Sequence, residues 1–440
     1  MTIMSGQLAA YGLGFLASIL IARAIGAEGR GLYYLPVIAA TACTAVFNLS
    51  IENANTVLVS QREYPLSRIS QNASLMACLL GPLAVGVMLA FWPAVDTTVF
   101  RGLAFTDYVI AVATIPFGLH LLWLANIFLL GKRPGRSQAA LLAGAALQLA
   151  GVGVAYAGGF LSVTLVLVLY AGSVTLPWLL HIWWSRGVAS VRPVVDRTLA
   201  RAVAALGMRL HLGLISFYLL LRFDVFLVSV YRDPADVGVY SVAVLFAELA
   251  WLLTAPLTQA IVPFQAELSA QGAAPLAFKA ARFNVALALL LSAAFAGTLW
   301  FVVPDLYGAQ FADAYPAIVL LLPGIVAVSV VRPLTWVLTR LDRPLLYSAM
   351  FLGAFALNCA LNMALIPALG INGASIASSI AYVALATASV AWALRAGRLG
   401  GGDGLLPTRA DVATVRAALS GLKARIAARH PSEGIPPDRR

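Results

Sequence analysis

Long, uninterrupted apolar blocks constrain this chain more than any other feature. The block from Val285 to Val303 has close to the ~20 residues that a membrane-spanning helix requires. Only small or weakly polar residues such as Ser292 and Thr298 interrupt it. A transmembrane β-barrel would instead alternate apolar and polar residues in segments of roughly 10 residues. The sequence therefore predicts an all-α membrane protein.

The composition excludes an ordinary soluble domain. Hydrophobic residues make up 61% of the 440 positions and charged residues 11%, whereas soluble domains are about 45–50% apolar and about 25% charged. The net charge of +11 would indicate nucleic-acid binding in a soluble protein, but in a membrane protein it reports orientation. We therefore expect no nucleic-acid partner. Cys43, Cys78 and Cys359 lie far apart in apolar segments, so neither disulfides nor a metal site are predicted.

The apolar blocks predict twelve spanning helices. They lie at residues 4–23, 33–59, 72–93, 108–130, 138–157, 162–184, 211–231, 238–262, 283–303, 315–338, 346–366 and 371–394. The first block has no basic segment before it and no small-residue cleavage site after it. We therefore expect a retained helix rather than a signal peptide.

The basic residues gather in the loops on one side of the predicted helices. Those loops carry Arg62, Arg68, Lys132, Arg133, Arg136, Arg186, Arg192, Arg197, Arg201, Arg209, Lys279, Arg282, Arg340 and Arg343, and the basic C-terminal tail lies on the same side. The opposite loops hold Arg23, Arg30, Arg101 and Arg232 among several carboxylates. Because Lys and Arg collect in cytoplasmic loops, both termini are predicted to be cytoplasmic.

The two halves of the chain resemble each other at matching places in this topology. The paired motifs are Gly31-Leu32-Tyr33 with Gly238-Val239-Tyr240, Arg133-Pro134 with Arg343-Pro344, and the amides Gln148 with Asn358. This duplication predicts two six-helix lobes, at 1–200 and 201–396, related by a pseudo-twofold axis along the membrane normal. A cavity between the lobes is the expected substrate site.

The segment 397–440 differs in character from the two lobes. A glycine-rich linker precedes an amphipathic stretch at 408–426, with an apolar face and several basic residues. This pattern predicts a helix lying on the anionic cytoplasmic leaflet. A coiled-coil contact with a protein partner is the alternative.

Ionisable residues inside the spans are the candidate functional groups, because each costs about 2.5–3.5 kcal/mol at the membrane centre. They are Glu52, Arg222, Asp224, Glu248 and Arg332, and His120 lies near the middle of the fourth span. Arg222 and Glu248 lie at similar depths in adjacent spans. They therefore form either a structural ion pair or, with Arg222 facing the cavity, a contact for an anionic substrate.

Several candidates keep two interpretations. Arg332 is either a second anion contact or a side chain that extends to the cytoplasmic face. Glu52 lies in the polar stretch 48–55, which indicates a water-lined or broken helix, and it either binds a coupling ion or bonds to its neighbours. His120 is either a substrate contact or a packing residue. Arg30, with Arg23, is either an exit contact for pyrophosphate or a solvated loop charge.

Enzyme signatures are missing from the sequence. It contains no metal-ligand cluster, nucleophile elbow or P-loop, and it has four histidines. No loop on the outer side is long enough for a catalytic domain. We therefore expect neither an enzyme nor a cofactor.

Three ordered stretches resemble the polysaccharide or O-antigen flippases (Wzx type) of the multidrug/oligosaccharidyl-lipid/polysaccharide exporter superfamily. These are Ala22-Arg23-Ala24-Ile25-Gly26-Ala27-Glu28-Gly29-Arg30-Gly31-Leu32-Tyr33; Arg222-Phe223-Asp224-Val225-Phe226-Leu227-Val228 with Val237-Gly238-Val239-Tyr240; and Leu357-Asn358, Asn362, Ile366-Pro367 and Gly370-Ile371-Asn372-Gly373-Ala374. The resemblance covers residues 4–395. Arg222 and Asp224 are the charges that match it best.

The resemblance implies alternating access in a bacterial cytoplasmic membrane, with an undecaprenyl-pyrophosphate-linked oligosaccharide as substrate. It also implies ion coupling and a central cationic cavity for the charged head of the substrate. From the residues themselves, we assign ion coupling to Glu52, Asp224 and Glu248. The candidate substrate contacts are Arg222, Arg332, His120 and Arg30. Membrane lipids, a polysaccharide polymerase and glycosyltransferases are the expected partners. The alternative is a cation-coupled drug antiporter of the same fold, which an acidic cavity would favour. Two further alternatives from other functional classes are a membrane glycan polymerase and a scaffold protein.

Overall fold

The computed structural model describes residues 3–61, 63–268, 270–340, 344–397 and 405, and the regular secondary structure of this part of the chain is entirely helical. Its helices are α1 (Ile3–Phe47), α2 (Ile51–Ser60), α3 (Leu66–Val95), α4 (Phe105–Val112), α5 (Ile115–Leu130), α6 (Pro134–Ala157), α7 (Val163–Ser185), α8 (Arg197–Tyr231), α9 (Pro234–Glu267), α10 (Ala270–Tyr307), the 3₁₀ turn η1 (Ala309–Phe311), α11 (Ala314–Arg340), α12 (Pro344–Leu369) and α13 (Ile371–Gly397). The predicted all-α membrane fold is confirmed. The predicted helix at 408–426 lies outside the described residues.

The first two predicted spans form one helical hairpin within α1. Eleven stretches of the described residues are long and apolar enough to cross a membrane, and one of them, Ser5–Ser60, is 56 residues long. Gly26, with φ 71° and ψ −174°, interrupts α1. Arg30 Nη1 donates to Ser18 O at 2.9 Å, whereas twelve residues of straight helix would span about 18 Å. The chain therefore reverses at Gly26, and the eleven stretches correspond to the twelve predicted spans.

The polar stretch 48–55 is a break in the second span, as its composition indicates. α1 ends at Phe47 and α2 begins at Ile51, with Leu49 and Ser50 between them at φ 49° and 54°. Such left-handed angles are uncommon for residues other than glycine. Trp123, which is fully buried, donates its indole N–H to Asn48 Oδ1 at 2.6 Å. This bond holds a polar side chain of the break against α5.

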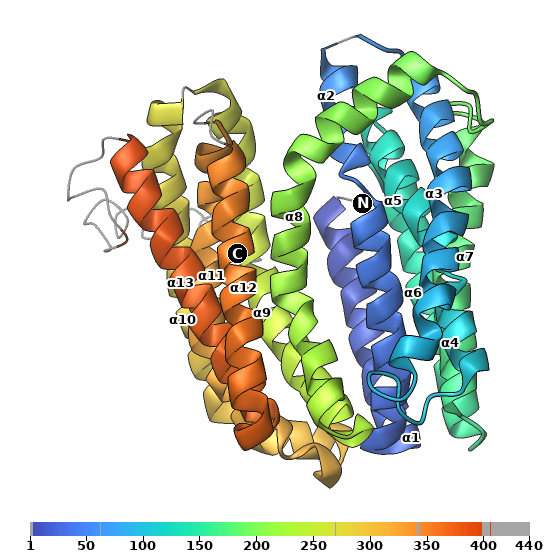
Figure 1. Cartoon of the computed structure of the whole chain (residues 1–440), viewed down its shortest axis with the longest axis vertical. Helices are drawn as coiled ribbons and strands as arrows, with labels where there is room; N and C mark the ends of the chain where they lie inside the picture. The colour runs from blue at the N-terminus through green and yellow to red at the C-terminus, as the bar shows by residue number, and fades with distance from the viewer. Residues whose placement is uncertain (1–2, 62, 269, 341–343, 398–404, 406–440) are drawn as a thin grey trace, which may run out of the picture.

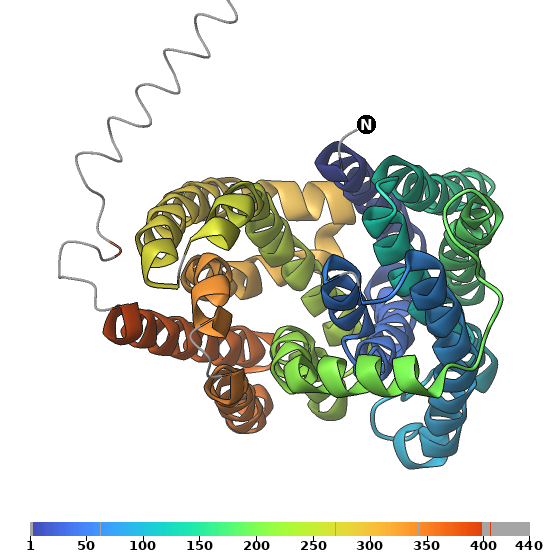
Figure 2. The same ribbon diagram turned by 90° about the horizontal axis from the view of Figure 1, so that it is seen from above.

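The helices gather into two groups (Figure 1). In the N-terminal bundle, α1–α7, α6 packs on α1 and α7, and α5 packs on α3 and α7. In the C-terminal bundle, α8–α13, α12 packs on α8 and α13, and α11 packs on α9, α10 and α13. α8 begins over the N-terminal bundle, where Gly207 lies against the carbonyl oxygen of Leu49, and then bends down between the groups (Figures 1 and 2). It is therefore the direct link between them.

The two bundles meet most closely where α1 crosses the start of α9. A Cβ added at Gly31 would overlap the carbonyl oxygen of Pro234, and one added at Gly238 would overlap that of Ala27. The two copies of the repeated Gly-x-Tyr motif thus face each other, as a pseudo-twofold axis between duplicated halves requires. We call this region the closed end; it lies at the bottom of Figure 1.

Arginine side chains donate to backbone carbonyls across the closed end. Arg23 Nε donates to Leu306 O at 2.7 Å. Arg101 Nη2 donates to the carbonyl oxygens of Ser229, at 2.9 Å, and Arg232, at 3.0 Å. These bonds join the N-terminal bundle to the end of α10 and the end of α8. The closed end is therefore held by helix packing and by charge-assisted hydrogen bonds.

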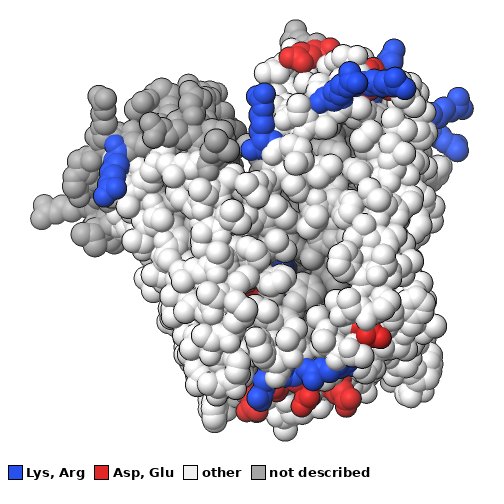
Figure 3. Space-filling model, in the orientation of Figure 1, with Lys and Arg blue, Asp and Glu red and all other residues white. Residues whose placement is uncertain are grey.

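A groove separates the bundles and widens away from the closed end (Figure 3). Lys and Arg are the more prominent charges around the wide end, where some Asp and Glu also show, and the closed end shows both signs of charge (Figure 3). By the positive-inside rule, the wide end is the one predicted to face the cytoplasm. Blue and red atoms also lie deep in the middle of the groove (Figure 3).

Candidate functional site

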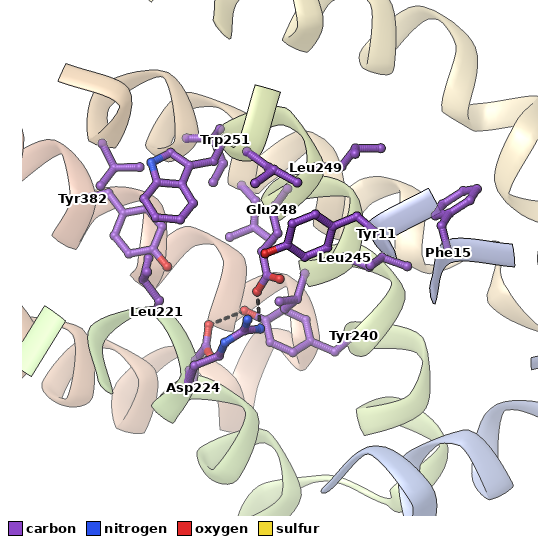
Figure 4. A pocket seen from close by; sticks show the side chains of 17 residues that line it. Tyr11, Phe15, Leu221, Asp224, Tyr240, Leu245, Glu248, Leu249, Trp251 and Tyr382 are labelled. Carbon is purple, nitrogen blue, oxygen red and sulfur yellow. Dashed lines mark hydrogen bonds and ion pairs between the residues drawn. The ribbon is translucent and has the colours of Figure 1, made fainter. Parts of the chain in front are cut away.

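The central pocket lies between the bundles and has a volume of about 220 Å³. α1 contributes Tyr11 to its lining, and α8 contributes Arg222 and Asp224. α9 contributes Val244, Ala247, Glu248 and Trp251, which follow helical spacing. Residues of α11 and α13 complete the lining. Figure 4 shows the carboxylates of Asp224 and Glu248 in this pocket. The pocket thus contains two of the three carboxylates predicted within the spans.

Arg222 and Glu248 form an ion pair between Nη1 and Oε1. Their side chains are 24% and 37% exposed, so the pair lies in the wall of the pocket rather than in packed core. The two predicted interpretations are therefore not exclusive. The pair bridges α8 and α9, and both charges remain accessible from the pocket.

Asp224 is buried and bonded to neutral donors. Its Oδ2 accepts from Tyr240 Oη at 2.6 Å and from Ser378 Oγ at 3.0 Å, and its Oδ1 accepts from the backbone N–H of Val225 at 2.9 Å. Asn358, the amide that the repeat singles out, donates to Ser378 Oγ at 3.1 Å. Within the described residues, Asp224 forms no ion pair. A carboxylate so placed needs a positive partner, because an unpaired charge in the membrane is costly.

Arg332 lies beside the same pocket. Its guanidinium carbon is 3.7 Å from the centroid of the Trp251 ring, in the geometry of a cation–π contact. No carboxylate among the described residues lies within ion-pair distance of it. Arg332 therefore brings a positive charge to the edge of the pocket that no protein carboxylate balances.

Glu52 lines a different space, which we call the N-terminal cavity. This cavity has a volume of about 590 Å³ and lies among α1, α2, α5, α6, α7 and the middle of α8. Glu52 Oε1 accepts from Asn53 Nδ2 at 3.2 Å, whereas Oε2 is buried without a hydrogen-bond partner among the described residues. The structure thus separates Glu52 from Asp224 and Glu248, with which it was grouped as an ion-coupling residue.

His120 and Arg30 line neither cavity. His120 is buried, and its ring nitrogens bond to Ser74 Oγ at 3.1 Å and to Trp178 Nε1 at 3.2 Å. Arg30 is 5% exposed at the closed end, where its Nε donates to Ser241 Oγ at 2.7 Å. Both are engaged in packing contacts, so we leave them out of the proposed substrate site.

The sequence did not single out several residues of this region. Tyr240, Ser378 and Trp251 come from helices whose contacts with α8 and α11 depend on the packed fold. Tyr240 lies in the repeated Gly-x-Tyr motif, which is the one signal that pointed to its position. Among the described residues, no group of three or more His, Cys, Asp or Glu is placed to hold a metal ion.

No protein-family model matches the chain, and no curated protein matches it. Solved structures do. A multidrug resistance MATE family transporter of the MOP superfamily, in an inward-facing conformation, matches with a TM-score of 0.66 at 15% identity, over 90% of this chain and 96% of that one. A structure described as the outward-facing conformation of a multidrug resistance MATE family transporter matches with a TM-score of 0.61 at 14% identity, over 90% of this chain and 94% of that one.

The lipid II flippase MurJ, in an inward closed conformation, matches with a TM-score of 0.71 at 12% identity, over 91% of this chain and 88% of that one. The chain therefore has the fold of MOP superfamily transporters. At these identities the likeness extends to the fold and not to the substrate.

Proposed function

We propose that this chain transports an undecaprenyl-pyrophosphate-linked oligosaccharide across a bacterial cytoplasmic membrane by alternating access. The observation that carries the proposal is Arg332, a cation beside the central pocket that no carboxylate of the described residues balances. A planar guanidinium matches pyrophosphate oxygens in geometry and charge. The match to a structure described as a lipid II flippase supports a lipid-linked substrate. Glycosyltransferases would then act before this step and polysaccharide polymerases after it.

In this mechanism the pyrophosphate competes with Glu248 for Arg222. The ion pair lies in the pocket wall, so a phosphate oxygen reaches the guanidinium from the pocket side. Arg332 contributes the second positive charge, and the repeat interface is where transporters of duplicated folds hold their substrates. The closed end then opens while the wide end closes, which releases the lipid-linked sugar on the other side.

Replacing Arg332 with alanine is expected to lower transport about ten- to a hundredfold, because hydrogen bonds to charged groups contribute about 1.5–3 kcal/mol. Arg332→Lys keeps the charge but loses the paired N–H groups, so it should lie between the wild type and Arg332→Ala. The measurement is flipping of undecaprenyl-pyrophosphate-linked oligosaccharide in proteoliposomes. Equal flipping rates for the wild type and Arg332→Ala would show that Arg332 is not an anion contact.

The coupling ion, in this proposal, binds at Asp224. The carboxylate is buried and has hydroxyl and amide neighbours on α9, α12 and α13. A proton or Na⁺ there would neutralise it and change how these helices pack. Glu248, once displaced from Arg222, is the second site for a proton.

Asp224→Asn is expected to remove the dependence of transport on an imposed Na⁺ or proton gradient, because the amide side chain carries no charge to neutralise. Glu52→Gln is the matched comparison, since Glu52 lines the other cavity. Flipping rates with and without each gradient test this. An Asp224→Asn variant that still responds to a gradient as the wild type does would move the coupling site elsewhere.

One observation favours a second candidate, a cation-coupled antiporter that exports cationic compounds. Glu52 is the one carboxylate among the described residues of the N-terminal cavity, and no Lys or Arg lines that cavity. An acidic cavity suits an organic cation. Export of tetraphenylphosphonium that depends on Glu52, without any change in glycan lipids, would favour this candidate.

A further inference from the structure

The N-terminal cavity is larger than the central pocket, at about 590 Å³ against about 220 Å³. Its size falls in the range of roughly 300–1,000 Å³ typical of small-molecule sites. It forms beside the chain break at 48–50, where α1 ends and α2 begins, and the middle of α8 lines one side. No step in the proposed transport of the pyrophosphate uses this space.

The lining of this cavity combines apolar walls with hydroxyl and amide groups. The lining side chains with hydroxyl or amide groups are those of Thr41, Thr44, Asn48, Ser50, Asn53, Thr114, Tyr170 and Tyr218. None of the described lining residues is Lys or Arg, so the cavity does not suit a pyrophosphate. Hydroxyl and amide groups can each donate and accept hydrogen bonds, so this lining matches an uncharged, hydroxyl-rich ligand. Glu52 Oε2, which has no partner among the described residues, adds an acceptor.

One face of α8 contributes to the linings of both cavities. His211, Leu214, Ile215 and Tyr218 line the N-terminal cavity, and Leu221 and Arg222 line the central pocket. Steps of three and four residues keep these side chains on the same side of the helix. Tyr218 and Arg222 are one turn apart, with Cβ atoms about 5–6 Å apart. A ligand whose charged group contacts Arg222 can therefore extend into the N-terminal cavity.

We propose that the N-terminal cavity binds the uncharged glycan of the substrate while the central pocket holds its pyrophosphate. The inference rests on the proposed transport function and assigns its substrate two compartments. The hydroxyl and amide groups around Asn53 bond to sugar hydroxyls, and the apolar walls contact the sugar rings. The cavity then selects for glycan size, whereas the pocket selects for the charged head.

The test compares two lipids in proteoliposomes that contain the full chain: undecaprenyl pyrophosphate with a single N-acetylglucosamine, and the same lipid carrier with the complete repeat unit from the producing cells. Gly118→Phe fills the cavity. Gly86→Phe is its control, because Gly86 is exposed on α3, outside both cavities, and a Cβ there would meet nothing within 4 Å. Asn53→Leu keeps the branched shape of the side chain and removes the amide.

Gly118→Phe and Asn53→Leu should each lower transport of the full repeat about tenfold and that of the single-sugar lipid less than about twofold. Gly86→Phe should transport both lipids as the wild type does. Equal effects on both lipids in Asn53→Leu, or no effect on either, would overturn the glycan compartment. Failure of the wild type to move either lipid would instead overturn the proposed function. Saturable tetraphenylphosphonium binding that Glu52→Gln abolishes, with full-repeat transport intact in Gly118→Phe, would assign the cavity to a cation.

Discussion

Gly31→Ala is expected to abolish or nearly abolish transport while the protein still inserts. The added methyl group would overlap the carbonyl oxygen of Pro234, and because Cβ is fixed by the backbone, no rotamer relieves the overlap. Overpacking costs about 1–3 kcal/mol. In this variant the cost arises when the closed end is shut. A penalty of that size shifts a two-state equilibrium about 5- to 150-fold. The protein should therefore remain open at that end and fail to cycle.

Gly12→Ala is the matched control, because Gly12 lies in the other arm of the α1 hairpin and a Cβ there would meet nothing within 4 Å. The conformational readout is a single cysteine at Leu245, in the lining of the central pocket, in a chain whose three natural cysteines are replaced. A membrane-impermeant maleimide added outside should label it faster in Gly31→Ala than in Gly12→Ala. If Gly31→Ala transports and is labelled at the same rates as the wild type, the contact between Gly31 and Pro234 does not close the transporter.

Arg222→Ala is expected to lower transport about ten- to a hundredfold, because the pyrophosphate loses a charge-assisted contact of about 1.5–3 kcal/mol. The variant also leaves Glu248 without its partner. A loss of transport alone therefore does not separate a structural ion pair from a substrate contact.

The charge-swapped double variant Arg222→Glu with Glu248→Arg separates the two roles. It restores the pair between α8 and α9 but moves the positive charge to the other helix. We expect near-normal membrane insertion and thermal stability, with transport still lowered, because the cation no longer lies where the pyrophosphate meets it. Full recovery of transport in the double variant would show that the pair acts only as a structural bridge.

The fold was largely predictable from sequence because the length of an apolar block is a local property. All twelve spans occur close to their predicted positions, and the break at 48–50 lies where polar residues interrupt an apolar block. The chain reverses at Gly26 within α1 because of the backbone angles of that one residue. The facing of Gly31 and Gly238 follows from the pseudo-twofold axis, which the repeated motifs had indicated.

The site was less predictable, because its contacts join residues distant in sequence. Depth along adjacent spans was enough to suggest the pair of Arg222 and Glu248. It did not reveal that Asp224 bonds to Tyr240 and Ser378, since those bonds depend on helix rotation and register. For the same reason, sequence alone grouped Glu52 with two carboxylates that line a different cavity.

The most direct test of the central claim is made in cells lacking this protein, by measuring surface polysaccharide and undecaprenyl-linked oligosaccharide on the cytoplasmic face. If the chain is the flippase, these cells should lose the surface polysaccharide and accumulate the lipid-linked oligosaccharide inside. The wild-type chain should reverse both changes, and Arg332→Ala should not. Unchanged levels of both glycan pools would contradict the account and favour the export of cationic compounds instead.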